Sequence, residues 1–234
     1  MLDQAFDALK SYNWGTDIKP LNPIKDAVVA AHEDAAVRKD LETRLAAFLK
    51  SDGSRDAKDY CCRKLRVVGS AASVPTLAEL LPEKDHSHMA RYALERIPSE
   101  EAAKAMRDAL SKLNGNLKIG AIASLGVRRD QASVAAIAAL LADKEAAIAV
   151  AAATALGDIG GADAVKALAG AKPTDAGVKQ AVIDAKLVCA EHLVKADKKS
   201  DAMAIYKSLA GADEPKHVRL AATRGMLACA GKKE

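Results

Sequence analysis

Apolar and small residues recur along the chain at offsets 0, 3, 4, 7 and 8 of successive segments, which is the spacing of one face of an α-helix. In the clearest segment these offsets are Ile148, Ala151, Ala152, Ala155 and Leu156. The segments that begin at His86 and Leu117 repeat the period, with His86 and Ser124 as the polar exceptions. No stretch alternates with the period of two that a strand needs. The pattern predicts an all-α chain.

The amphipathic segments come in pairs that repeat with a period of about 30 residues. Two leading helices are predicted at 2–11 and 23–32. The pairs that follow are 35–50 with 54–68, 73–81 with 86–97, 100–113 with 116–126, 131–142 with 145–159, 162–170 with 176–196, and 199–210 with 215–230. A single pair cannot bury its own apolar face, so neighbouring pairs must stack. We therefore expect an α-solenoid, a superhelix of about six antiparallel helix pairs with an N-terminal capping segment.

The predicted domain layout has two parts. Residues 1–34 form capping helices and an irregular loop, and residues 35–234 form one continuous repeat array. The loop, SYNWGTDIKPLNP at 11–23, holds the only tryptophan of the chain, Trp14. We expect this loop to cover the exposed end of the first repeat, with Trp14 in the core rather than in a site.

Residues with cap chemistry stand at the predicted helix ends. Serine and aspartate occupy the positions where N-caps are needed, at Ser54, Ser99, Asp130 and Asp143. Glycine follows apolar runs where a left-handed C-terminal residue is wanted, at Gly69, Gly126 and Gly160.

Composition adds that the chain is helix-rich, soluble and nearly balanced in charge. Half of the residues are apolar but only 3% are aromatic, which favours closely stacked helices over one aromatic core. The net charge of +4 arises from 35 basic and 31 acidic residues, which argues against nucleic acid as a partner. No run approaches the ~18 apolar residues of a membrane span, and the start MLDQAFDALK has no signal-peptide apolar region. We expect a cytoplasmic protein with no membrane partner.

The four cysteines predict no redox or zinc site. Cys61, Cys62, Cys189 and Cys229 all fall at apolar helix positions, and no CxxC pair occurs. Such thiols behave as small hydrophobic residues, so we expect them to be buried and reduced.

Three stretches resemble a known repeat family. They are LAELLPEKDHSHMARYALERIP, ASVAAIAALLADKEAAIAVAAATALGDIG and IYKSLAGADEPKHVRLAATRGML. They are similar to the HEAT-like repeats, in the bacterial subtype named after phycobilisome lyases, over residues 35–230. The resemblance implies a right-handed, armadillo-like α-solenoid whose second helices line a concave surface. It says little about function, because these repeats serve as scaffolds in unrelated systems. Pro98, in place of the usual glycine, and the long helix at 176–196 depart from the pattern and leave local curvature open.

Basic residues recur at fixed positions of the second helices, where they would flank the groove. The candidate binding residues are Lys118, Lys179, Arg91, Tyr92, Arg63, Lys58, Arg219 and Arg224. A row of cations along a groove can recognise acidic peptides or phosphates. The alternative is a structural ladder, because Asp52 precedes Lys58 by six residues and Asp213 precedes Arg219 by six.

Catalytic and metal motifs are missing from the sequence. GxSxG, HExxH, P-loop and GxGxxG sequences do not occur, and His86 and His88 lack the i, i+4 spacing of a metal pair. We therefore expect no catalytic residue, metal or cofactor. The leading hypothesis is a monomeric, non-catalytic scaffold that binds an unidentified protein or peptide in its concave groove. Two alternatives stay open: a bilin lyase-like or chaperone activity on a tetrapyrrole, which the subtype name suggests, and DNA binding by a basic concave face.

Overall fold

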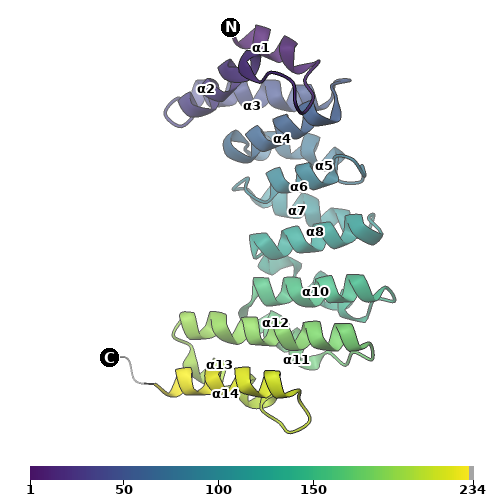
Figure 1. Cartoon of the computed structure of the whole chain (residues 1–234), viewed down its shortest axis with the longest axis vertical. Coiled ribbons are helices and arrows are strands. Elements are labelled where there is room, and N and C mark those ends of the chain that lie inside the picture. Colours follow the sequence, from purple (N-terminus) through teal and green to yellow (C-terminus); the bar gives the residue numbers. More distant parts are fainter. Residues whose placement is uncertain (232–234) are drawn as a thin grey trace. The chain divides into compact units, whose positions relative to one another are not determined.

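The computed structural model describes residues 1–231, which form α-helices and short 3-10 helices and contain no β-strand (Figure 1). The chain divides into two compact units, Met1–Ser124 and Leu125–Glu234, and the division falls within α8 (Gly115–Arg128). In both units consecutive helix pairs stack as in an α-solenoid, so the predicted fold class is confirmed. The predicted boundary at residue 34 stays a prediction.

The first unit contains two layers of helices. Its helices before α8 are α1 (Leu2–Leu9), α2 (Asn22–Ala30), α3 (Ala35–Leu49), α4 (Arg55–Val68), α5 (Val74–Glu79), α6 (Ser87–Leu94) and α7 (Glu100–Ala109). The first helices of successive pairs, α3, α5 and α7, pack against one another, and the second helices α4 and α6 do the same.

The second unit repeats this arrangement. Its helices after α8 are α9 (Val134–Ala139), α10 (Ala146–Ile159), α11 (Gly161–Gly170), α12 (Ala176–Lys195), α13 (Lys199–Leu209) and α14 (Lys216–Ala230). The second helices α10, α12 and α14 form one layer, and α9 packs on α11 in the other. Every predicted helix is present, although the segments predicted at 73–81 and 131–142 are short helices preceded by 3-10 turns.

The predicted apolar face forms the core. In α10, Ile148, Ala152, Ala155 and Leu156 are buried, and each buried leucine or isoleucine contributes about 1.5–3 kcal/mol. All four cysteines are buried and free, as predicted. Burial raises the pKa of the Cys61 thiol well above its usual value and that of Cys62 to about 12, so both thiols stay protonated. Among the described residues, no helix is long and apolar enough to cross a membrane.

Second helices touch one another at a recurring pair of positions, and in the second unit these positions carry the smallest residues. A Cβ atom on Gly126 of α8 would lie 3.1 Å from the Cα of Ala155 on α10. A Cβ atom on Gly157 of α10 would lie 3.0 Å from the Cα of Ala185 on α12. Gly126 and Gly157 both lie nine residues after the first apolar position of their helix, and the alanines both lie seven after theirs. Glycine therefore sets how closely these backbones approach.

The predicted cap chemistry is correct for the serines. The Oγ atom of Ser54 accepts from the backbone N–H of Ala57 at 3.1 Å, and that of Ser99 accepts from Ala102 at 3.3 Å. Asp130 is the N-cap residue of the 3-10 helix Gln131–Ser133, as predicted, but its side chain makes no cap hydrogen bond. The prediction for Asp143 is wrong. Asp143 lies two residues before the N-cap Glu145, whose N–H it accepts at 2.9 Å.

The predicted left-handed glycines are wrong at two of three positions. Gly69 is extended, with φ −62° and ψ 151°, and Gly126 lies inside α8. Gly160 has φ +65° with ψ −160°, so it provides positive φ without the left-handed helical conformation. A glycine is needed at position 126 because α8 packs closely on Ala155 of α10 there, and not because the helix ends.

Replacing Gly157 by leucine should destabilise the protein by about 1–3 kcal/mol, because the new side chain would push α10 and α12 apart. The free energy of unfolding in urea, followed by far-UV circular dichroism, measures the effect. The matched control is Gly170→Leu at the end of α11, where a Cβ meets no atom within 4 Å; its change should stay within about 0.5 kcal/mol. Equal losses for the two variants would contradict the close-approach account.

Candidate functional site

Helix α4 turns basic side chains away from the core. Ser54 caps its start, and its buried stripe includes Ala57, Cys61 and Leu65. Arg63 and Arg66 are three residues apart, which places them on one helix face. Val67 follows Arg63 by one turn and is 45% exposed.

Each of three basic residues of α4 lies over an aromatic ring. The guanidinium carbon of Arg63 is 5.4 Å from the ring centroid of Trp14, and that of Arg66 is 4.3 Å from the centroid of Tyr92 on α6. The Nζ atom of Lys64 is 4.7 Å from the ring of Tyr60. A cation stacked in this way gains about 0.5–1 kcal/mol at an exposed site and keeps its edge donors available. We call Trp14, Arg63, Arg66 and Tyr92 the cation–aromatic surface. Lys64 is two residues from Arg66 and therefore lies on another face of α4.

The N-terminal loop holds the ring of Trp14 on the outside. The backbone N–H of Trp14 donates to Asp56 Oδ2 at 2.8 Å, which anchors the loop to the first turn of α4. Tyr12 fills the buried position beside Tyr60, with ring centroids 5.8 Å apart and 5% of Tyr12 exposed. Trp14 meets Tyr12 edge-on at 6.1 Å and is 57% exposed. The prediction that Trp14 lies in the core is wrong, because Tyr12 takes that place.

The cations of this surface have no carboxylate partner. Among residues 1–231, no ion pair within 4.0 Å involves Arg63, Lys64, Arg66 or the neighbouring exposed Arg96. The Nε atom of Arg66 is buried and has no hydrogen-bond partner in that range. Burial lowers the pKa of Lys64, and the positive charges of Lys25 and Arg63 lower it further. The surface is therefore crowded with like charge.

A buried carboxyl group lies near this surface. Asp59 is 8% exposed, and its Oδ1 atom has no hydrogen-bond partner among the described residues. Burial raises the pKa of Asp59, and the nearby charges of Arg55, Arg63 and His86 oppose the shift. His86 Nδ1 lies 3.2 Å from Glu83 Oε2, while His86 Nε2 is buried without a partner.

Comparison with known proteins identifies the repeats. Residues 103–186 match the family model for HEAT repeats. HEAT repeats therefore occur in residues 103–186, which contain α8, α9, α10 and α11. No curated protein matches the sequence of this chain.

The solved structures with a similar backbone fold include proteins of different kinds. An engineered protein is 20% identical with a TM-score of 0.46, over 97% of this chain and 68% of its own. Human deoxyhypusine hydroxylase in complex with glycerol is 16% identical with a TM-score of 0.46, over 82% and 96%. The complex of CpcE and CpcF of phycocyanin lyase from Nostoc sp. is 18% identical with a TM-score of 0.46, over 98% and 94%. Likenesses at this level carry no argument about activity.

The structure places the predicted binding residues in different surroundings. Arg63 and Tyr92 belong to the cation–aromatic surface, joined through Arg66. Lys58 on α4 and Lys118 on α8 are half-buried. In the second unit the remaining candidates are exposed, and they are Lys179, Arg219 and Arg224.

Arg91 joins two second helices, α6 and α8. Its Nη1 atom donates to the carbonyl of Gly120 at 3.0 Å and to Ser124 Oγ at 3.1 Å, and Ser124 donates to Glu95 Oε1 at 2.7 Å. Burial lowers the pKa of Arg91. Its guanidinium occupies the space that a Cβ atom on Gly120 would need. Arg91 therefore has a structural role, because its hydrogen bonds to Gly120 and Ser124 connect α6 to α8.

The predicted ladder of acidic and basic residues is absent from the described residues. Neither Asp52 with Lys58 nor Asp213 with Arg219 forms an ion pair within 4.0 Å there. Sequence reasoning also missed Lys64 and Arg66, although the three-residue spacing from Arg63 to Arg66 signals a shared face.

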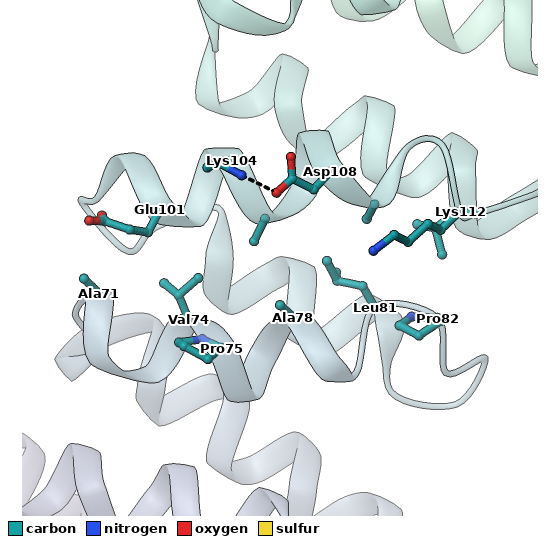
Figure 2. A pocket seen from close by; sticks show the side chains of 13 residues that line it. Ala71, Val74, Pro75, Ala78, Leu81, Pro82, Glu101, Lys104, Asp108 and Lys112 are labelled. Atoms are coloured by element: carbon teal, nitrogen blue, oxygen red, sulfur yellow. Dashed lines mark hydrogen bonds and ion pairs between the residues drawn. The ribbon is translucent and has the colours of Figure 1, made fainter.

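The grooves between neighbouring first helices result from the short side chains that line them. Figure 2 shows a groove of about 460 Å³ between α5 and α7, with Val74, Ala78 and Leu81 on one side. On the other side, Lys104 is paired with Asp108 at 2.5 Å. The second unit has hollows of about 670 and 420 Å³ beside α11, also lined by alanines. Such grooves arise because alanine is too short to fill the space between stacked helices. No group of three or more His, Cys, Asp or Glu residues that could hold a metal occurs in residues 1–231.

Replacing Asp59 by asparagine should stabilise the protein by about 1 kcal/mol at pH 7, because it removes a buried charge without a hydrogen bond. A raised pKa means that the destabilisation is complete above the folded-state pKa. It disappears below the ordinary value of 3.8, where both states are protonated. Urea unfolding between pH 3 and 7 tests this, with the exposed Asp213→Asn as control. A pH-independent difference between Asp59→Asn and the wild type would contradict the assignment.

Proposed function

We propose that this protein is a non-catalytic interaction module that binds a segment of a partner protein at the cation–aromatic surface. One observation carries the proposal: three basic side chains of α4 stack on aromatic rings, and none of them has a carboxylate partner among the described residues. Each of these cations already lies over a ring, so less side-chain entropy is lost when an anion binds.

Exposed apolar side chains beside the cations support a protein as the partner. Trp14 and Val67 are large, exposed and next to Arg63. Aromatic and arginine side chains are enriched at the centres of protein interfaces, where their burial contributes most of the binding energy.

Nucleic acid is the less suitable partner for this surface. Proteins that bind single strands stack bases on free aromatic faces. Here Arg63 lies over one face of Trp14 and Arg66 over one face of Tyr92, and the ring of Tyr60 is buried, so fewer faces are left for bases. The formal net charge of +4 also provides little long-range attraction for a polyanion.

The state of the Cys61 thiol on α4 supports a non-catalytic role. Cys61 is fully buried, and burial raises the pKa of its thiol well above the usual value. A cysteine acts as a nucleophile in its thiolate form, whereas the raised pKa keeps Cys61 in the neutral thiol form.

The double variant Arg63→Glu with Arg66→Glu should reduce capture of the partner by at least about 10-fold in quantitative pull-downs from the native cell extract, because two edge donors become repulsive charges. The control is Lys39→Glu with Lys84→Glu, two exposed lysines outside the surface and without an ion pair among the described residues. Unchanged far-UV circular dichroism must accompany both variants. If the surface variant and the control capture the same proteins in equal amounts, the proposal is wrong.

A further inference from the structure

Helix α14 leaves an apolar face uncovered. In the second unit, the residue nine positions after the first apolar position of a second helix contacts the next second helix, and there Gly126 and Gly157 are buried. The first apolar position of α14 is Val218, so the corresponding residue is Leu227, which is 68% exposed. Leu220 lies seven residues before Leu227 on the same face and is 51% exposed. The stacking face is therefore open in α14, which packs on α12 and α13 through its other side.

An arginine stands between the two exposed leucines. Arg224 is exposed, four residues after Leu220 and three before Leu227, so all three share one helix face. Among residues 1–231, no ion pair within 4.0 Å involves Arg224. Helix α14 also carries Lys216 and Arg219 and has no acidic residue. A complementary surface must therefore offer an apolar side chain flanked by carboxylates.

Helix α2 of the first unit carries this complementary pattern. Val29 is 65% exposed, Asp26 precedes it by three residues, and Glu33 follows it by four, in the turn after the helix. Both carboxylates are exposed, and neither forms an ion pair within 4.0 Å in the described part of the chain. The one cation beside them, Lys25, lies toward α4, where its charge lowers the pKa of Lys64.

We infer that α14 of one molecule docks on α2 of a second copy of this chain. Val29 of the second copy packs against Leu220 and Leu227, and the long side chain of Arg224 reaches the carboxylates of Asp26 and Glu33. The interaction involves neither Arg63 nor Arg66, so it is independent of the proposed function. It departs from the expected monomer.

The charge of α14 argues against the alternative in which two copies of α14 pair with each other. A two-fold axis through the centre of the face would bring Arg224 of both molecules together, and like charges repel. Contact between α14 and α2 joins two different surfaces instead. Each molecule in a pair then keeps one free α14 and one free α2, so further copies add as the concentration rises.

Sedimentation velocity of the full chain tests the inference. The weight-average sedimentation coefficient should rise between about 10 μM and about 500 μM, because a contact of this size is weak. Two neutral variants each remove one surface: Leu220→Gln with Leu227→Gln on α14, and Asp26→Asn with Val29→Gln on α2. Each should lower the association constant at least about 10-fold. The control is Val127→Gln, at a 56% exposed valine of α8 outside both surfaces, which should associate as the wild type does.

A mixture of the two surface variants separates this contact from non-specific aggregation. The α14 variant keeps its α2 surface, and the α2 variant keeps its α14 surface. Mixed in equal amounts, they should form a dimer and nothing larger, because only one intact contact is possible in each pair. Far-UV circular dichroism must be unchanged in both variants and in the control.

Three results would overturn the inference. A sedimentation coefficient that stays constant up to about 500 μM would show that copies do not associate. A wild-type dimer that is lost in the α14 variant but kept in the α2 variant would show that α14 pairs with itself. A mixture that forms no dimer would show that the two surfaces do not meet. The Arg63→Glu, Arg66→Glu variant should associate as the wild type does, so failure here leaves the proposed function untouched.

Discussion

Each second helix in this fold must bury one side against the second helix of the next repeat, and the residues at that contact decide how closely the two backbones approach. The same register recurs, nine residues after the first apolar position on one helix and seven on the next. Gly126 meets Ala155 in this register, and Gly157 meets Ala185. Glu95 meets Ser124 in the same register through a hydrogen bond of 2.7 Å. Glycine and alanine give direct backbone contact, whereas the polar pair needs a third residue, Arg91, to satisfy its buried groups.

The residue at this contact position also decides whether polar side chains are left on the surface for a partner. At the corresponding position of α4 the residue is Arg66, which cannot be buried as glycine is and instead reaches over the ring of Tyr92 on α6. The first unit therefore joins its second helices by arginine side chains, and some of their donors stay available. The site proposed for a partner protein is in this sense a consequence of how α4 and α6 are held together. The buried carboxyl group of Asp59, whose pKa is raised by burial, lies near the same surface, and we expect its charge to lower stability at neutral pH.

The helices could be predicted from the sequence because a period of 3.6 residues is local information. Burial of the cysteines followed for the same reason, since each falls at or beside the apolar face of its own helix. Arg63 and Tyr92 were found by comparing equivalent positions of the repeats. The direction of Trp14 could not be found in this way, because it depends on Tyr12 filling the core and on the bond from Trp14 to Asp56, 42 residues away. Arg91 looked like a binding residue because sequence periodicity gives its face but not its partners, Gly120 and Ser124.

The central claim is that a helix pair of this chain cannot fold without its neighbours, and a peptide of residues 71–98 tests it most directly. This peptide contains α5 and α6 with the turns that join them, but lacks α4 and α7, which cover their apolar faces. Far-UV circular dichroism at 25 °C should show a largely unfolded peptide, because isolated helices shorter than ~12–15 residues are marginal in water. A cooperatively melting helical pair in the isolated peptide would contradict the account.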